Sequence, residues 1–191
     1  MLTRAGFAEV YSLEGGIHAW NGLINEGLPD TKWFLIAETP AQLLALAWLL
    51  EEGTRRFYAE IGAGMENPQT QGIFSRLAQA EVNHKEMLIA LWPEFTGSPE
   101  APAPPTDVLE NPPAEVILES GISLQEGLRW CKGRSDVEIL ELAMSMETAA
   151  YDRYLRMVDE TPMENGRNMF LKLAEEERNH LRRLGTELDR L

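Results

Sequence analysis

The chain has little of what disulfide-bonded, zinc-binding or membrane proteins need. Of its 191 residues only Cys131 is a cysteine, which excludes an internal disulfide and a Cys-x-x-Cys metal knuckle and fits a reducing cytoplasm. No apolar run approaches the ~18 residues that a membrane-spanning helix requires. The first residues also lack the charged-then-apolar layout of a signal peptide. We therefore expect a soluble, cytoplasmic protein.

Basic residues are scarce as well. The chain has 17 Lys and Arg against 31 Asp and Glu, which gives a formal net charge of −14. Such an excess of negative charge argues against nucleic acid or an anionic membrane as a partner. Hydrophobic residues make up 44% of the chain and charged residues 25%, as in ordinary globular proteins. The length suits one folded core with a small appendage.

Histidine is rarer still, and two of the three histidines belong to a repeated pattern. Glu-x6-Tyr followed by Glu-x-x-His occurs twice, and the separation of the copies is constant, since 147 − 51 and 180 − 84 are both 96. A Glu from each of two helices and Glu-x-x-His from each of two others form the ligand set of di-iron and di-manganese sites in four-helix bundles. The two copies consist of Glu51, Tyr58, Glu81 and His84, and of Glu147, Tyr154, Glu177 and His180.

The ionisable residues of this pattern lie in the middle of apolar helical seams. One such seam, at alternating steps of three and four, consists of Leu44, Ala47, Glu51, Thr54, Tyr58 and Ile61. A buried, unpaired carboxylate costs several kcal/mol, and four carboxylates close together also repel one another. Two divalent cations would offset the four negative charges. The pattern therefore predicts a buried site for two metal ions.

Helix start signals divide the chain into two pairs of helices. The sequence predicts long helices at about 39–62, 68–92, 136–159 and 162–190. A cap residue opens each of them, either in a capping box or directly before a proline. Short turns make each pair an antiparallel hairpin. The four cap residues are Thr39, Asn67, Ser135 and Thr161.

A proline-rich segment at about 93–122 separates the two hairpins. Its seven prolines exclude a continuous helix. A short helix then follows from Ser123, which opens a capping box, to about Cys131. A connection of this length can run along a whole helix and join the hairpins by a crossover. The sequence therefore predicts an all-α, ferritin-like four-helix bundle.

The duplicated motifs around a proline-rich crossover resemble the rubrerythrin branch of the ferritin-like superfamily over about residues 37–190. The resemblance implies a non-haem centre of two iron ions, with manganese or mixed metals as alternatives, that reacts with hydrogen peroxide or dioxygen. By matching position it implies two bridging carboxylates, two terminal carboxylates and one histidine for each metal: Glu81 and Glu177, Glu51 and Glu147, and His84 and His180.

The resemblance also concerns residues beyond the ligands. It implies a supporting catalytic role for Tyr58 and Tyr154, as hydrogen-bond donors to the bridging carboxylates; plain core packing is the alternative. Rubrerythrins proper carry a further glutamate one turn after Glu147, where this chain has Ala150. They also carry a four-cysteine iron site, which one cysteine cannot build, so electrons would come from a separate donor protein. The family-level expectation for assembly is a homodimer.

The first thirty residues resemble a different family. Gly6-Phe7, Gly15-Gly16 and Ala19-Trp20 follow the pattern of the last strand and helix of a rhodanese, a sulfur-carrying domain. The segment with the persulfide-forming cysteine would precede these residues and is absent. We therefore expect a rhodanese-like remnant at 1–30 and a di-iron domain at 31–191. Cys131 stands in a short stretch that echoes a rhodanese active loop, but a structural role is expected for it.

Several functions remain open at this point. The first is a di-iron oxidoreductase that reduces hydrogen peroxide or dioxygen. The alternatives are an iron-storage protein without turnover, a di-iron hydroxylase of an organic substrate, and a metal-free interaction bundle. The last leaves the buried carboxylates without compensation.

Overall fold

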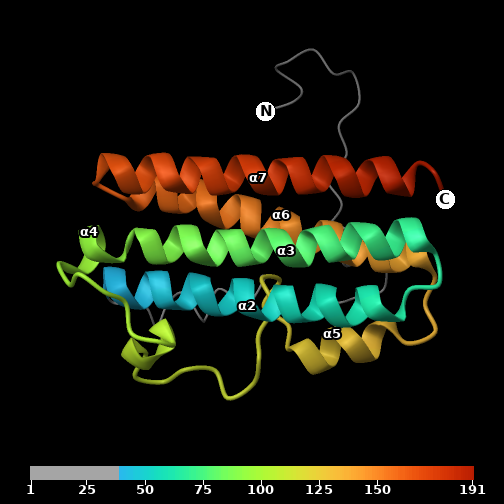
Figure 1. Cartoon of the computed structure of the whole chain (residues 1–191), viewed down its shortest axis with the longest axis horizontal. Coiled ribbons are helices and arrows are strands. Elements are labelled where there is room, and N and C mark those ends of the chain that lie inside the picture. Colours follow the sequence, from blue (N-terminus) through green and yellow to red (C-terminus); the bar gives the residue numbers. More distant parts are fainter. Residues whose placement is uncertain (1–38) are drawn as a thin grey trace, which may run out of the picture.

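Four long helices form the fold of the computed structural model, which describes residues 39–191 (Figure 1). Helix α2 packs along α3, and α6 packs along α7, so each pair is an antiparallel hairpin with a short turn, as predicted. The all-α, four-helix architecture is thereby confirmed, whereas the rhodanese-like remnant predicted at 1–30 lies outside the described residues. The long helices are α2 (Pro40–Gly64), α3 (Pro68–Ala90), α6 (Asp136–Glu160) and α7 (Glu164–Leu188).

Three of the four predicted helix starts carry the expected caps. Thr39 and Ser135 form complete capping boxes, and the side chain of Asn67 accepts a hydrogen bond from the backbone N–H of Gln69 at 2.9 Å. The prediction for Thr161 is wrong. Its backbone N–H bonds to the carbonyl of Met157 at 3.0 Å, so Thr161 ends α6 and is not free to open the next helix. Helix α7 therefore begins after Met163, without a side-chain cap.

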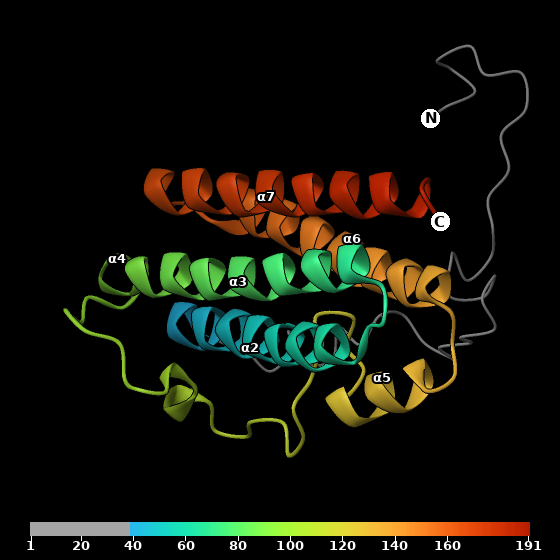
Figure 2. The same cartoon turned by 45° about the vertical axis from the view of Figure 1, so that its right-hand side comes forward.

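The connection between the hairpins runs along α2 and packs against it, as Figures 1 and 2 both show. It contains α4 (Trp92–Thr96), the 3₁₀ helix η3 (Pro105–Val108) and α5 (Leu124–Cys131). The crossover and the capping box at Ser123 agree with the prediction. The sequence did not predict α4 and η3. Both are compatible with the proline-rich segment because their prolines occupy first-turn positions, where the backbone N–H needs no partner within the helix.

Two apolar clusters fill the bundle on either side of its middle. The first includes Phe57, Phe74, Leu140 and Leu184. The second includes Leu44, Leu88, Phe170 and Leu173. Each cluster draws residues from all four long helices, so the middle of the bundle is closed at both ends by packed side chains.

Cys131 belongs to the first cluster and is 6% exposed. Burial raises the pKa of its thiol to about 12. A thiol of this kind is protonated at neutral pH and is a poor nucleophile, which agrees with the expected structural role.

No helix within residues 39–191 is both long enough and apolar enough to span a lipid bilayer.

Candidate metal centre

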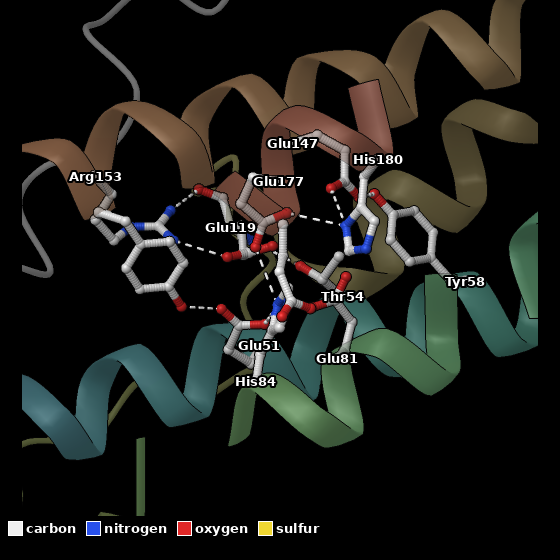
Figure 3. Close-up of polar contacts among 12 residues, drawn as sticks. Glu51, Thr54, Tyr58, Glu81, His84, Glu119, Glu147, Arg153, Glu177 and His180 are labelled. Atoms are coloured by element: carbon white, nitrogen blue, oxygen red, sulfur yellow. Dashed lines mark hydrogen bonds and ion pairs between the residues drawn. The ribbon is translucent and has the colours of Figure 1, made fainter. Parts of the chain in front are cut away.

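Each long helix brings one glutamate to the middle of the bundle, and α3 and α7 add one histidine each (Figure 3). The histidines follow the glutamates by three residues, so helical geometry places both side chains of each pair on one face. All six predicted ligand residues come together, and none is more than 3% exposed: Glu51, Glu81, His84, Glu147, Glu177 and His180.

One half of the cluster surrounds the Nδ1 atom of His84. An oxygen of Glu51 lies 3.2 Å from this nitrogen, and an oxygen of Glu81 lies 3.1 Å from it. The Oε1 atom of Glu177 approaches it to 3.0 Å. Three carboxylates from three helices thus converge on one imidazole nitrogen, and these four ligand atoms all lie within 4.8 Å of one another.

The other half surrounds the Nδ1 atom of His180. Oε2 of Glu147 lies 2.9 Å from this nitrogen, and Oε2 of Glu177 lies 3.1 Å from it. Glu177 therefore directs one oxygen at each histidine. Glu81 is also shared, because its ligand atoms fall within 4.8 Å of those of Glu147 and His180 as well as of the first half. The two imidazoles stack with their centroids 5.4 Å apart.

The two tyrosines connect the hairpins to each other. The hydroxyl of Tyr58 donates to Oε1 of Glu147 at 2.5 Å, and the hydroxyl of Tyr154 donates to Oε1 of Glu51. Each tyrosine thus holds the first carboxylate of the opposite hairpin. The expectation that the tyrosines bind Glu81 and Glu177 is wrong. Each tyrosine follows the glutamate on its own helix by seven residues, or about two turns, and at that distance along the bundle its hydroxyl meets the glutamate of the opposite hairpin.

Burial is the strongest influence on the charges of the cluster. It raises the pKa of Glu81 well above its usual value, and with the charge of Glu177 it raises the pKa of Glu147 to about 8. Burial also favours the neutral form of Glu177, but the two histidines outweigh it and hold the pKa of that carboxyl low. Burial opposes the charge of His180, yet contacts with Glu147 and Glu177 raise its pKa to about 10. In the absence of metal, Glu81, Glu147 and His180 therefore tend to hold protons, and bound cations would displace those protons.

The donor set fits metal ions better than it fits an internal hydrogen-bond network. Neither carboxylate oxygen of Glu81 makes a hydrogen bond, and the same holds for Oε1 of Glu177 and Nε2 of His84. Their contacts are close approaches of charged groups only: an oxygen of Glu81 and Oε1 of Glu177 lie 3.1 and 3.0 Å from Nδ1 of His84, and an oxygen of Glu176 lies 3.6 Å from its Nε2. Buried polar atoms are rarely left unpaired, and leaving a charged one unpaired is costly. Carboxylate and imidazole ligands suit iron and manganese.

Two charged residues beside this cluster, Glu119 and Arg153, were not predicted from the sequence. Arg153 on α6 donates to Oε1 of Glu119 at 2.9 Å, and Glu119 also contacts Thr54 on α2 through its backbone N–H, at 3.1 Å. Glu119 comes from the crossover and is 3% exposed. Nothing in the sequence distinguishes it from Glu115, four residues earlier in the same segment, which is exposed.

Two antiparallel helix hairpins that hold four carboxylates and two histidines at their centre define the ferritin-like proteins with a di-metal carboxylate site. The family model described as Rubrerythrin matches residues 42–188, which is most of the chain. The chain belongs to the rubrerythrin family, as its repeated motifs indicated. Neither the curated proteins nor the solved structures gave a significant match.

Proposed function

We propose that this protein is a di-iron oxidoreductase that reduces hydrogen peroxide or dioxygen with electrons from a separate donor protein. The observation that carries the proposal is the position of Glu177, whose two oxygens approach the two histidines at 3.0 and 3.1 Å. A carboxylate of this kind, together with Glu81, can be shared by two metal ions.

The six residues divide into two equivalent ligand sets. Glu51 and His84 would serve one metal, Glu147 and His180 the other, and Glu81 and Glu177 would bridge the two. Four carboxylates balance two divalent ions, so a neutral pair of histidines leaves the buried centre without net charge. When bound, two ferrous ions supply the two electrons that cleave the O–O bond of a peroxide, with two protons, to give two molecules of water.

The chain's own residues orient the ligands and shield them. The hydroxyl groups of Tyr58 and Tyr154 fix one oxygen of Glu147 and one of Glu51, which leaves the second oxygen of each to face its histidine. The apolar clusters above and below exclude bulk water from the centre. Cys131, the one cysteine of the sequence, lies buried in one of these clusters.

Metal analysis and rapid kinetics test the proposal. Protein purified without oxygen would be analysed for metal by elemental mass spectrometry and then mixed with peroxide or with dioxygen in a stopped-flow spectrometer. We expect two irons per chain and an optical change that is much faster with peroxide than with dioxygen. Slow oxidation by both would favour iron storage or hydroxylation instead. A chain that binds no metal after reconstitution would refute the proposal.

A further inference from the structure

We infer that Glu119 is a fifth carboxylate of the metal centre, delivered by the crossover and not by any of the four long helices. The inference rests on the metal centre proposed above and adds a ligand residue to it. It follows from how the crossover is fixed to α2, from the partners of the two Glu119 oxygens, and from the charge of the centre.

The crossover around Glu119 is a folded turn that packs closely on α2. Ile117 and Ser123 form an isolated antiparallel bridge, and the backbone N–H of Leu118 bonds to the carbonyl of Ile122 at 2.8 Å. The carbonyl of Ile117 approaches α2 so closely that a Cβ at Gly53 would stand 2.1 Å from its oxygen. This contact and the bond to Thr54 fix the backbone at Glu119 beside the bundle, so its side chain enters the core.

The two carboxylate oxygens of Glu119 differ in their surroundings. Oε1 accepts from Arg153 at 2.9 Å, and a second guanidinium nitrogen of Arg153 donates to the Glu119 carbonyl oxygen at 2.5 Å. Oε2 is buried and has no hydrogen-bond partner, and the side chain as a whole is 0% exposed. Buried carboxylate oxygens are rarely left unpaired, and this one belongs to a side chain that lies beside the ligand cluster, so the geometry points to a bound cation as its partner.

The carboxyl group of Glu119 lies beside the ligand cluster. Figure 3 shows Glu119 between Arg153 and the ligand cluster, and the charges of Glu51, Glu177 and Glu147 all act on its carboxyl group. Glu119 stands outside the groups whose ligand atoms lie within 4.8 Å of one another, so its side chain would have to turn toward the cluster to reach an ion held by the six residues.

The charge of the centre agrees with this assignment. Five carboxylates and one guanidinium carry a net charge of −4, which two divalent cations neutralise. Helix α6 offers one carboxylate only, because the residue one turn after Glu147 is Ala150, which is fully buried and has no ligand atom. The crossover would thus add a fifth carboxylate to the four that the long helices supply.

The test compares Glu119→Gln with a matched control, Glu187→Gln. Glu187 is also buried, at 1% exposed, has one arginine partner and has one unpartnered oxygen. It lies ten residues beyond Glu177 on α7, about 15 Å away along the helix. Cobalt(II) is the probe, because its visible absorption reports the number and type of its ligands, and anaerobic iron(II) titration gives the affinity.

We expect Glu119→Gln to weaken iron(II) binding at least tenfold and to change the cobalt spectrum, while Glu187→Gln leaves both as in the wild type. Unchanged affinity and spectrum in Glu119→Gln, with only a lower melting temperature, would overturn the inference and show a structural ion pair. Crystals of the manganese-loaded wild type give an answer that does not depend on variant folding. An oxygen of Glu119 at coordination distance supports the inference, and one that remains distant refutes it.

The two proposals fail in different ways. A wild-type chain that binds no metal would refute the metal centre and this inference together. A wild-type chain that binds two metals, with a Glu119→Gln variant that matches it, would refute the role of Glu119 alone.

Discussion

Among the glycines that the structure describes, Gly53 is the position at which an added methyl group would meet the closest backbone contact. An alanine Cβ there would stand 2.1 Å from the carbonyl oxygen of Ile117 and 2.9 Å from its carbonyl carbon. Both are backbone atoms, so no side chain can rotate to relieve the contact and the crossover itself must move away from α2. Gly53→Ala therefore tests whether the crossover is fixed to the bundle as closely as the structure shows.

Three contributions set the expected magnitude. Replacing a helical glycine by alanine stabilises a helix by about 0.5–1 kcal/mol. Overpacking a tight site costs about 1–3 kcal/mol. Loss of the hydrogen bond from the Glu119 backbone N–H to Thr54, now 3.1 Å long, costs about 0.5–1.5 kcal/mol. We expect a net loss of about 0.5–4 kcal/mol in the free energy of unfolding.

Gly185 provides the matched control, because it is also a helical glycine but a Cβ there would meet no atom within 4 Å. Gly185→Ala should gain about 0.5–1 kcal/mol from helix propensity alone. The assay is urea unfolding of the metal-free proteins, followed by circular dichroism, so that bound metal does not contribute to stability. If Gly53→Ala is as stable as Gly185→Ala, the close approach of the crossover is wrong.

Three further predictions concern the centre and the core. Glu81→Ala removes a shared ligand and should leave both metal positions empty; two metals per chain by elemental analysis would refute the bridging role. Tyr58→Phe removes a buried donor to the Glu147 carboxylate and should cost about 1.5–3 kcal/mol in unfolding free energy, with metal content retained; unchanged stability would contradict the structure. Because burial raises the pKa of Cys131 to about 12, its thiol should react slowly with an aromatic disulfide reagent at pH 8 and quickly in urea, and fast labelling of the native protein would refute its burial.

The six ligand residues could be predicted because they depend on local geometry. Glu81 and His84 share a helix face whatever the rest of the chain does, since three residues make nearly one turn. The repeat at 96 residues then gives the second hairpin the same arrangement, and only a bundle can bury both sets together. The partners of side chains that reach from one hairpin to the other were harder to predict. Tyr58 was expected to reach a bridging carboxylate, and it reaches Glu147 instead because the distance between hairpins decides its partner.

The sequence by itself therefore determined the four long helices, their pairing and the six residues that converge between them, because helical period, caps and turn lengths act over a few residues. Only the tertiary structure decided the roles of Glu119 and Arg153. Glu119 lies in a segment without helical period, and its burial depends on the contact of nearby Ile117 with Gly53, which is 64 residues away in the chain. Contacts of that range have no local sequence signal, because the space that α2 leaves for the crossover exists only after the bundle has folded.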